Sequence, residues 1–324
     1  MKYLLYRVRL NSLPLLGFLS RDSGHSALQA ESAKLHTVNK RDCVVAQCRI
    51  LLVATTLLLS SCVSQNFENV GSDPEVQKTW NDAYVSLPNG TLGYMKSPRV
   101  QAALAASQSF PVVIFFHGCA GLSGNSVNAF AESMNAAGYI FIAPDSMARD
   151  FRPQGCAGGN FSYTAKGIDW DTINRMRMEE IYYTISQVRS APWFKSNDLF
   201  LFGQSEGGLA VAAYSGSGVN AEVISGWGCP SYTLANRDST LIDRPVKAPP
   251  SVPVLNIKSK MDHVDTRPSD CGSSVWGRPG GSKVINPPNG HWFMDDAKYR
   301  QEVINFFDRN RHPDSSEPAK ESNK

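Results

Sequence analysis

A serine with the surroundings of a nucleophile is the first candidate for chemistry in this chain. Ser205 lies in the sequence GQSEG (203–207), which follows the apolar run Leu199–Phe202 and precedes a stretch of small residues. The G-x-S-x-G pattern is weak alone, but between a buried strand and a helix it is typical of a nucleophile on a sharp turn. Gly203 and Gly207 fit such a turn, because a Cβ at either position would collide with the neighbouring strand or helix.

A serine hydroxyl is a poor nucleophile until a base takes its proton, so a histidine is expected after a later strand. His291 meets this condition, since it lies in NGHWF beyond the last expected strand. The base in turn needs a carboxylate that fixes its tautomer and stabilises the imidazolium. We predict Asp262, which follows the expected strand Val252–Ile257, and keep Asp265 as the alternative because loop register is not set to three residues. Three other histidines are less well placed in the chain: His117, His263 and His312.

The oxyanion of an acyl-transfer reaction needs two backbone N–H donors. Glu206, directly after the serine, offers one amide. The apolar run Val112–Phe116 ends in His-Gly-Cys, and the glycine lets the amide of Cys119 approach a substrate. Only this amide is needed, so the Cys119 thiol is available for a disulfide, and a Cys119 nucleophile lacks the strand-to-helix context.

The apolar pattern predicts an α/β fold with one domain over residues 80–310. Continuous apolar runs separated by helical segments indicate strands buried on both faces, as in a mostly parallel sheet covered by helices. An antiparallel hairpin is expected at 83–95, around Pro88-Asn89-Gly90. The expected strands are 112–116, 139–143, 199–202, 221–224, 252–257 and 284–285, and the expected helices are 126–137, 171–189 and 296–309.

The N-terminal part has the features of a bacterial lipoprotein signal. Ile50–Leu59 is an apolar run of ten residues after basic residues, too short to span a bilayer, and it leads into Leu-Ser-Ser-Cys62, which resembles a lipobox. We expect an N-terminal extension and signal peptide over 1–61, lipidation of Cys62, a tether over 62–79 and a disordered tail over 311–324. A buried strand is the alternative for the apolar run. Because Lys40 lies far from Met1, a start codon downstream of Met1 is also expected.

These features predict a membrane-anchored lipoprotein of the cell envelope that faces the periplasm or the exterior. The formal charge of the whole chain is +3, but residues 1–61 hold eight Lys and Arg against three Asp and Glu. The rest of the chain therefore carries −2, which gives no electrostatic case for nucleic-acid binding.

Four cysteines follow the lipobox, at positions 119, 156, 229 and 271. In an oxidising compartment they allow three pairings, and their order favours Cys119 with Cys156 and Cys229 with Cys271. No pair has the spacing of a metal-binding CxxC, so no metal site is expected.

Five segments, spread in this order over residues 111–293, resemble the dienelactone hydrolase family of the α/β-hydrolase superfamily: PVVIFFHGCAG, GYIFIAPDS, FGQSEGG, VPVLNIKSKMD and NGHWF. The resemblance implies an eight-stranded, mostly parallel sheet, and it implies the same roles for Ser205, Asp262 and His291. The family's namesake enzymes use a cysteine nucleophile where this chain has Ser205, so ester hydrolysis is implied and the dienelactone substrate is not.

The expected function is hydrolysis of a small-molecule carboxylic ester through an acyl-enzyme on Ser205, with no metal or organic cofactor. Two alternatives remain open at this point. One is a catalytically silent binding or scaffold protein of the envelope, because a fold does not guarantee its function. The other is an acyltransferase or amidase that uses the same residues. The sequence predicts neither the substrate nor the oligomeric state.

Overall fold

The computed structural model describes residues 73–106, 110–122, 125–153, 155–156, 169–194, 197–229, 246–264 and 270–312. The chain separates into a unit of residues 1–64 and a unit of residues 65–324, and every described residue belongs to the second. The expected lipobox at Cys62, the alternative acid Asp265 and residues 313–324 of the expected tail lie outside the described residues. None of the described helices combines the length and apolar character that a membrane span requires.

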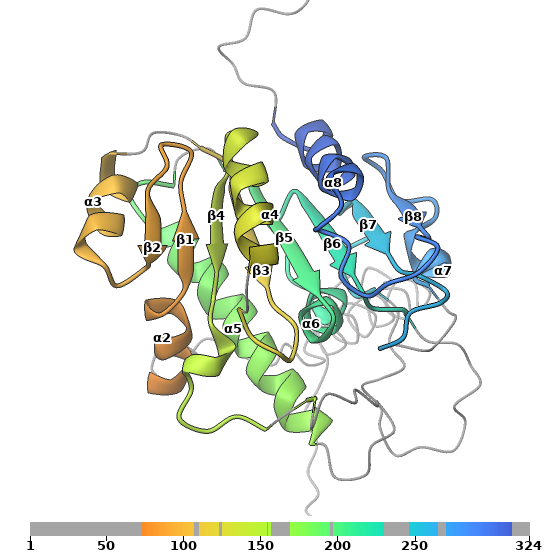
Figure 1. Cartoon of the computed structure of the whole chain (residues 1–324), viewed down its shortest axis with the longest axis horizontal. Helices are drawn as coiled ribbons and strands as arrows, with labels where there is room; N and C mark the ends of the chain where they lie inside the picture. Colours follow the sequence, from red (N-terminus) through yellow and green to blue (C-terminus); the bar gives the residue numbers. More distant parts are fainter. Residues whose placement is uncertain are drawn as a thin grey trace, which may run out of the picture. The chain divides into compact units, whose positions relative to one another are not determined.

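An eight-stranded sheet forms the centre of the described structure, in the order β2-β1-β4-β3-β5-β6-β7-β8 (Figure 1). Strands β3 to β8 run parallel to one another, whereas β1 runs antiparallel to both β2 and β4. The strands are β1 (Tyr84–Ser86), β2 (Leu92–Tyr94), β3 (Val112–Phe116), β4 (Ile140–Ala143), β5 (Leu199–Gln204), β6 (Ala221–Ser225), β7 (Val254–Ile257) and β8 (Lys283–Ile285).

Helices cover both faces of this sheet. On one face, Phe130 of α4 and Phe307 of α8 join a core cluster with the strand side chains. On the other face, Ile181 of α5 and Leu209 of α6 belong to a second cluster. Figure 1 shows α4 and α8 in front of the sheet and α5 behind it. The helices are α2 (Pro74–Asn81), α3 (Pro98–Ala106), α4 (Asn125–Ala136), α5 (Trp170–Ser190), α6 (Glu206–Ala213), α7 (Gly272–Val275) and α8 (Ala297–Arg309), with a 3-10 turn η2 (Ser146–Ala148).

The apolar runs that form β3 to β7 are buried along their length, whereas β8 at the edge of the sheet is partly buried. Every residue of β3 is buried, and its side chains alternate between the two clusters, with Ile114 in one and Phe115 in the other. Because both faces are covered, the strands show no apolar–polar alternation. The predicted hairpin is also present, with Val85 of β1 opposite Gly93 of β2. The predicted architecture, a mostly parallel eight-stranded sheet between helices, is therefore confirmed.

The described residues include a helix that the sequence pattern does not indicate, since α2 occupies the last residues of the expected tether at 62–79. The Asp73 side chain accepts a hydrogen bond from the Glu75 amide at 2.9 Å and caps the helix, and Pro74 stands in its first turn. Only Val76 and Thr79 are buried, so too few apolar positions mark this helix in the sequence. Residues 74–79 are helical, which corrects the expected extent of the tether.

Glu222 is a carboxyl group in the core, at the amino-terminal part of β6. It is fully buried, and neither side-chain oxygen has a hydrogen-bond partner among the described residues. Burial raises the pKa of Glu222 well above its ordinary value, although the charge of Arg278 acts in the opposite direction. In the folded protein this residue therefore carries a free-energy cost that depends on pH.

We expect Glu222→Gln to stabilise the protein increasingly as pH rises. The folded pKa of Glu222 lies above the unfolded one, so wild-type stability is lost as pH rises from the unfolded pKa through the folded pKa. Urea unfolding at pH 4 and pH 8 checks this, with a gain of roughly 1–3 kcal/mol expected at the higher pH and little gain at the lower. Glu302→Gln, on a partly exposed residue of α8, is the control. A gain that is equal at both pH values would contradict the assignment.

Candidate active site

Ser205 lies on a sharp turn between β5 and α6. Its backbone has φ 55° and ψ −114°, a positive φ that residues other than glycine seldom adopt. The Ser205 amide donates to the carbonyl of Ser225 in β6 at 2.8 Å, and the Leu209 amide donates to the Ser205 carbonyl at 3.0 Å. Strand β6 and helix α6 thus hold the turn from both sides.

Two glycines make this turn possible. A Cβ on Gly203 would overlap the carbonyl of Gly207, and a Cβ on Gly207 would overlap the carbonyl of Phe116 at the end of β3. The strand before Ser205 and the helix after it therefore approach each other, and β3, more closely than a side chain would allow. This is the crowding that the G-x-S-x-G sequence predicts.

A hydrogen-bonded acid–base pair comes from the loops that follow β7 and β8. His291 Nδ1 and Asp262 Oδ2 are 2.8 Å apart, and the Asp262 side chain is fully buried. The Val264 amide donates to Asp262 Oδ1 at 2.8 Å. Burial raises the pKa of Asp262, but the hydrogen bonds from His291 and Val264 and the charges of His291 and Lys258 outweigh it, so the pKa lies below its ordinary value. Asp262 is an ionised partner for the imidazole.

The His291 loop is attached to the turn that carries Ser205. Gln204, directly before Ser205, donates from Nε2 to the His291 carbonyl at 2.9 Å. Gly226 lies against the ring, because a Cβ at this position would stand 3.1 Å from His291 Cε1. Within the described part of the chain the Ser205 hydroxyl makes no hydrogen bond, so the Ser205–His291 contact is not closed in this structure. Catalytic hydrogen bonds are often long in a protein without substrate and tighten when substrate binds.

The loop after β3 passes directly beside the serine. A Cβ on Gly118 would lie 3.1 Å from Ser205 Cβ and 3.7 Å from Ser205 Oγ. The next residue is Cys119, the predicted donor. The other predicted donor, Glu206, is the first residue of α6, and the first amides of a helix have no intrahelical acceptor. Both predicted oxyanion donors are therefore next to the serine in space or in sequence.

The sheet topology and the sharp turn at Ser205 together decide the fold. The chain has the α/β-hydrolase fold. Three chain features agree with it: a strand-to-helix turn at the serine, an acid after a later strand and a histidine after the last strand, in the order Ser205, Asp262, His291.

Proteins named as esterases or hydrolases are among the solved structures similar to this chain. No protein-family model and no curated protein sequence matches it. Est1E from Butyrivibrio proteoclasticus, solved with ferulic acid bound, is 15% identical with a TM-score of 0.44, covering 70% of this chain and 94% of its own. A Klebsiella pneumoniae protein assigned as a dienelactone hydrolase is 15% identical, with a TM-score of 0.45. The match covers 70% of this chain and 98% of the Klebsiella chain. XC6422 from Xanthomonas campestris, a serine hydrolase without a lid, is 14% identical, with a TM-score of 0.42. The match covers 71% of this chain and 89% of XC6422.

A buried ion-pair network of the α/β-hydrolase domain lies behind the serine. Arg177 Nε is 3.0 Å from Glu206 Oε1, Arg177 Nη1 is 2.9 Å from Glu180 Oε2, and Arg177 Nη2 donates to the His117 carbonyl. Burial raises the pKa of Glu180, but Arg177 and Arg149 outweigh burial, so the pKa lies below its ordinary value. One guanidinium from α5 thus contacts the side chain of one predicted donor residue and the backbone of the loop that leads to the other.

A second arginine and a glycine complete this packing. Arg152 Nη2 pairs with Glu206, and Arg152 Nε donates to Ser146 Oγ at 2.9 Å. A Cβ on Gly155 would overlap Glu206 Oε2 and would lie 3.5 Å from Cys119 Cβ. The segment that contains Arg152 and Gly155 therefore packs against both predicted donor residues.

Both predicted disulfides are present in the described residues. Cys119 is bonded to Cys156, and Cys229 is bonded to Cys271. The first joins the loop after β3 to the segment of Arg152 and Gly155. Since its sulfur is in a disulfide, Cys119 is not available as a thiolate nucleophile, and its backbone amide is the group left for chemistry.

The other described histidines have structural partners or face solvent. His117 Nε2 accepts a hydrogen bond from the Ser146 amide at 3.0 Å, so its Nδ1 carries the proton and donates to the Gly118 carbonyl at 2.6 Å. Burial and the Arg177 charge lower the pKa of His117 to about 3, which keeps this ring neutral. His312 Nδ1 is hydrogen-bonded to Asp198 Oδ1 at 2.7 Å.

His263 is the remaining described histidine near the Asp262–His291 pair. It follows Asp262 directly and is exposed. In the described ranges, no group of three histidine, cysteine, aspartate or glutamate side chains is placed to hold a metal ion.

Among the residues of this site that were not predicted are Gln204, Arg177 and Lys258. Gln204 holds the His291 loop, Arg177 holds the loop after β3, and the Lys258 ammonium is 3.4 Å from Asp262 Oδ2. Each is a polar residue within or beside an apolar run or stripe of the sequence. A long polar side chain in such a position has to find a buried partner, and this is the signal that could have indicated them.

Proposed function

We propose that the protein is a serine hydrolase that cleaves carboxylic esters. Ser205 attacks the ester carbonyl while His291 takes its proton, and Asp262 holds the imidazole and stabilises its charged form. The amides of Glu206 and Cys119 bind the oxyanion of the tetrahedral intermediate. His291 then protonates the leaving alcohol. Water hydrolyses the acyl-enzyme with the same groups, which returns Ser205 and releases the acid.

The observation that carries this proposal is that the loop of the Asp262–His291 pair is hydrogen-bonded to the turn that bears Ser205. A serine at φ 55° is a strained conformation that a fold keeps where it serves a purpose. The strain lies on the turn whose neighbouring residue, Gln204, binds the His291 backbone. A buried, ionised Asp262 at 2.8 Å from His291 Nδ1 leaves Nε2 to act as the base.

Turnover of a panel of nitrophenyl esters tests the proposal. The purified protein is expected to release nitrophenol from short-chain esters, and Ser205→Ala is expected not to. If the wild type binds ester analogues without turnover, it is a binding protein instead. Product analysis with competing alcohols and amines, and with matched anilides, separates ester hydrolysis from acyl transfer and amide cleavage. Transfer or amide cleavage faster than hydrolysis would contradict the ester assignment.

The resemblance to dienelactone hydrolases extends this proposal to substrate class only in part. The namesake enzymes of that family have a cysteine nucleophile, whereas this chain has Ser205. This difference favours simple carboxylic esters over dienelactone as substrates. Est1E binds ferulic acid, an aromatic acid. Esters of aromatic acids therefore belong in the panel beside aliphatic ones.

We expect the Cys119–Cys156 disulfide to affect catalysis, whereas the Cys229–Cys271 disulfide affects stability alone. The two close loops of similar length, with sequence separations of 37 and 42, so the loss of either is expected to cost roughly 4 kcal/mol of stability. Only the first anchors the Cys119 amide. Replacing both of its cysteines by serine is expected to lower kcat roughly 10- to 100-fold, because small displacements of an oxyanion donor are costly.

The matched control for this prediction replaces Cys229 and Cys271 by serine. Steady-state kinetics and urea unfolding on both double variants, at a temperature where both are folded, give the comparison. Equal effects on kcat from the two variants would show that the first disulfide has no special role at the oxyanion donors.

We further propose that the protein is anchored to the cell envelope by a lipid on Cys62, with the hydrolase domain facing the periplasm or the exterior. The support is the apolar run Ile50–Leu59 and the small residues before Cys62. Mass spectrometry of the N-terminal peptide of the mature protein is expected to show a diacylglyceryl cysteine. A mature protein that starts elsewhere, or a Cys62 without lipid, would contradict this proposal.

A further inference from the structure

A fully buried lysine stands beside the candidate acid, and the mechanism above does not use it. Lys258 follows Ile257, the last residue of β7, and its side chain has no exposed surface. Its ammonium is 3.4 Å from Asp262 Oδ2 and donates to the Ser259 carbonyl at 2.9 Å. A buried ammonium is costly unless it is paired, so this position needs a reason beyond packing.

The backbone of Lys258 is fixed on both sides. Its amide donates to the Ile285 carbonyl at the end of β8 at 3.0 Å, and its carbonyl accepts from Asn286 Nδ2 at 2.9 Å. Asn286 begins the loop that carries His291. Lys258 is therefore held by the two strands whose following loops bear Asp262 and His291.

One carboxylate oxygen is shared by two positive or potentially positive groups. Asp262 Oδ2 is 2.8 Å from His291 Nδ1 and 3.4 Å from Lys258 Nζ. An ammonium at this distance favours the ionised carboxylate, and it also repels a second positive charge on the imidazole. The ionised carboxylate stabilises the imidazolium, whereas repulsion by the ammonium opposes protonation of the candidate base. Because the hydrogen bonds from His291 and the Val264 amide already favour the ionised carboxylate, the repulsion is the effect that Lys258 adds at His291.

We propose that Lys258 is a positioning residue for the base: its ammonium, fixed beside the Asp262 oxygen that holds the His291 ring, repels a positive charge on the imidazole, so that the base stays neutral at lower pH than it would without Lys258. This inference rests on the function proposed above for Ser205, Asp262 and His291. It predicts an acid limb of the pH–activity profile that depends on a residue that does not touch the substrate.

Among the residues that the structure describes, the other charged groups near this pair are engaged elsewhere or are exposed. Lys258 and His291 are the charged side chains that act most strongly on the Asp262 carboxyl. His263, on the same loop, is exposed. The remaining described acids nearby have these partners: Glu206 pairs with Arg177, Asp270 Oδ2 accepts from Asn286 at 3.1 Å, and Asp295 Oδ1 accepts from Trp292 Nε1 at 2.9 Å.

The test compares the pH dependence of kcat/KM in the wild type, Lys258→Met and Lys258→Arg. Methionine fills similar space without the charge, so the acid limb is expected to move upward by about one pH unit. Arginine keeps a positive charge and is expected to restore the limb toward the wild-type position. At high pH, where the imidazole is neutral in all variants, kcat/KM of Lys258→Met is expected to approach the wild-type value.

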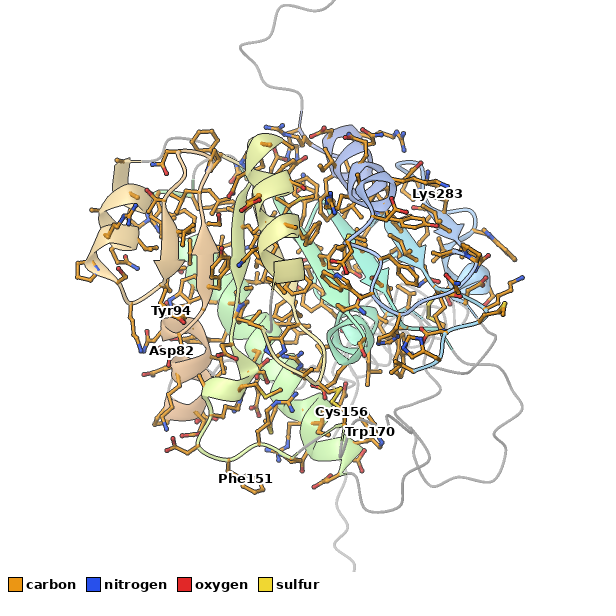
Figure 2. All side chains as sticks on the ribbon, viewed as in Figure 1. Asp82, Tyr94, Phe151, Cys156, Trp170 and Lys283 are labelled. Atoms are coloured by element: carbon orange, nitrogen blue, oxygen red, sulfur yellow. A yellow bond between two sulfur atoms is a disulfide. The ribbon has the colours of Figure 1, made fainter. Side chains whose placement is uncertain are left out.

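Lys283→Met is the matched control. It removes a lysine from the neighbouring strand β8, where the ammonium pairs with Glu302 at 2.6 Å. Figure 2 shows Lys283 beside α8, far from Cys156, whose disulfide marks the loop next to Ser205. Its loss changes the net charge equally, and the acid limb is expected to stay in place.

A second readout does not depend on activity. NMR titration of the His291 ring, assigned with His291→Gln, is expected to show protonation at higher pH in Lys258→Met than in the wild type. If Lys258→Met does not fold, Lys258→Gln takes its place, since an amide retains a donor for the Ser259 carbonyl. An unshifted titration in a folded variant would overturn the role of Lys258. Absence of ester turnover in the wild type would instead reject the proposed function, and the titration would still decide on Lys258.

Discussion

Replacing Ser205 by alanine is expected to lower kcat/KM for an ester substrate by on the order of 10⁶-fold, as loss of a nucleophile does in serine hydrolases. Without the hydroxyl no acyl-enzyme forms, and the oxyanion donors alone give a small residual rate. Stability is expected to change little, because the hydroxyl makes no hydrogen bond with the described residues and alanine accepts the same backbone as serine. Steady-state kinetics and a thermal melt measure the two effects.

Ser225→Ala is the matched control for this variant. Ser225 is a buried serine at the end of the neighbouring strand β6, and its carbonyl, not its side chain, holds the Ser205 amide. Its hydroxyl has no hydrogen-bond partner among the described residues. Activity close to that of the wild type is expected. A Ser205→Ala protein that keeps more than a tenth of wild-type activity would show that another nucleophile acts.

Asp262→Asn is expected to lower kcat by on the order of 10⁴-fold at neutral pH. The asparagine amide occupies the same space but donates to His291 Nδ1, so the ring takes the tautomer in which Nε2 carries the proton and is not a base. The charge that stabilises the imidazolium is lost as well. Kinetics at pH 7.5 on a folded variant, verified by circular dichroism, measure this effect.

Asp265→Asn is the informative comparison, since Asp265 is the other acid that the sequence offers after β7. Activity within a few-fold of the wild type is expected, because Asp262 is the acid that binds His291 Nδ1. A loss of activity in Asp265→Asn that exceeds the loss in Asp262→Asn would move the role of the acid to Asp265.

Much of the sheet is predictable because its signal is local. The parallel strands are mostly apolar runs. The predicted strand before Ser205 ends two residues before β5 does, since Gly203 and Gln204 continue it. The helix expected at 171–189 is α5, and its apolar residues from Ile173 to Val188 recur at helical spacing and are buried. A strand that is buried on both faces needs apolar side chains at successive positions, so such a run can be recognised from the sequence alone.

Helices α2 and α3 could not be predicted from apolar patterning. In α3, Val100 and Leu104 are the only buried residues, so the helix has one buried apolar residue per turn and no continuous apolar stripe. The start of α2 depends on the cap at Asp73, a single side-chain hydrogen bond. Short helices held by a cap and two contacts have no period that a window of residues can detect.

In the candidate site too, some features could be predicted from the sequence and others could not. The chain order of Ser205, Asp262 and His291 is visible because each follows a recognisable strand. The pairing of Arg177 with Glu206 joins residues from two helices, and the approach of Lys258 to Asp262 depends on how the loop after β7 folds back. Such contacts depend on tertiary structure, and the sequence shows only that these polar residues lie in apolar surroundings.

Labelling with a fluorophosphonate, followed by peptide mass spectrometry, tests the central claim most directly. The folded wild type is expected to carry one phosphonyl group on Ser205, with labelling much slower in His291→Gln and absent in the urea-unfolded protein. Selective labelling of this kind requires an activated hydroxyl, so it reports on Ser205 and His291 together. A folded wild type that is not modified at Ser205, or is modified at another residue instead, would contradict the account.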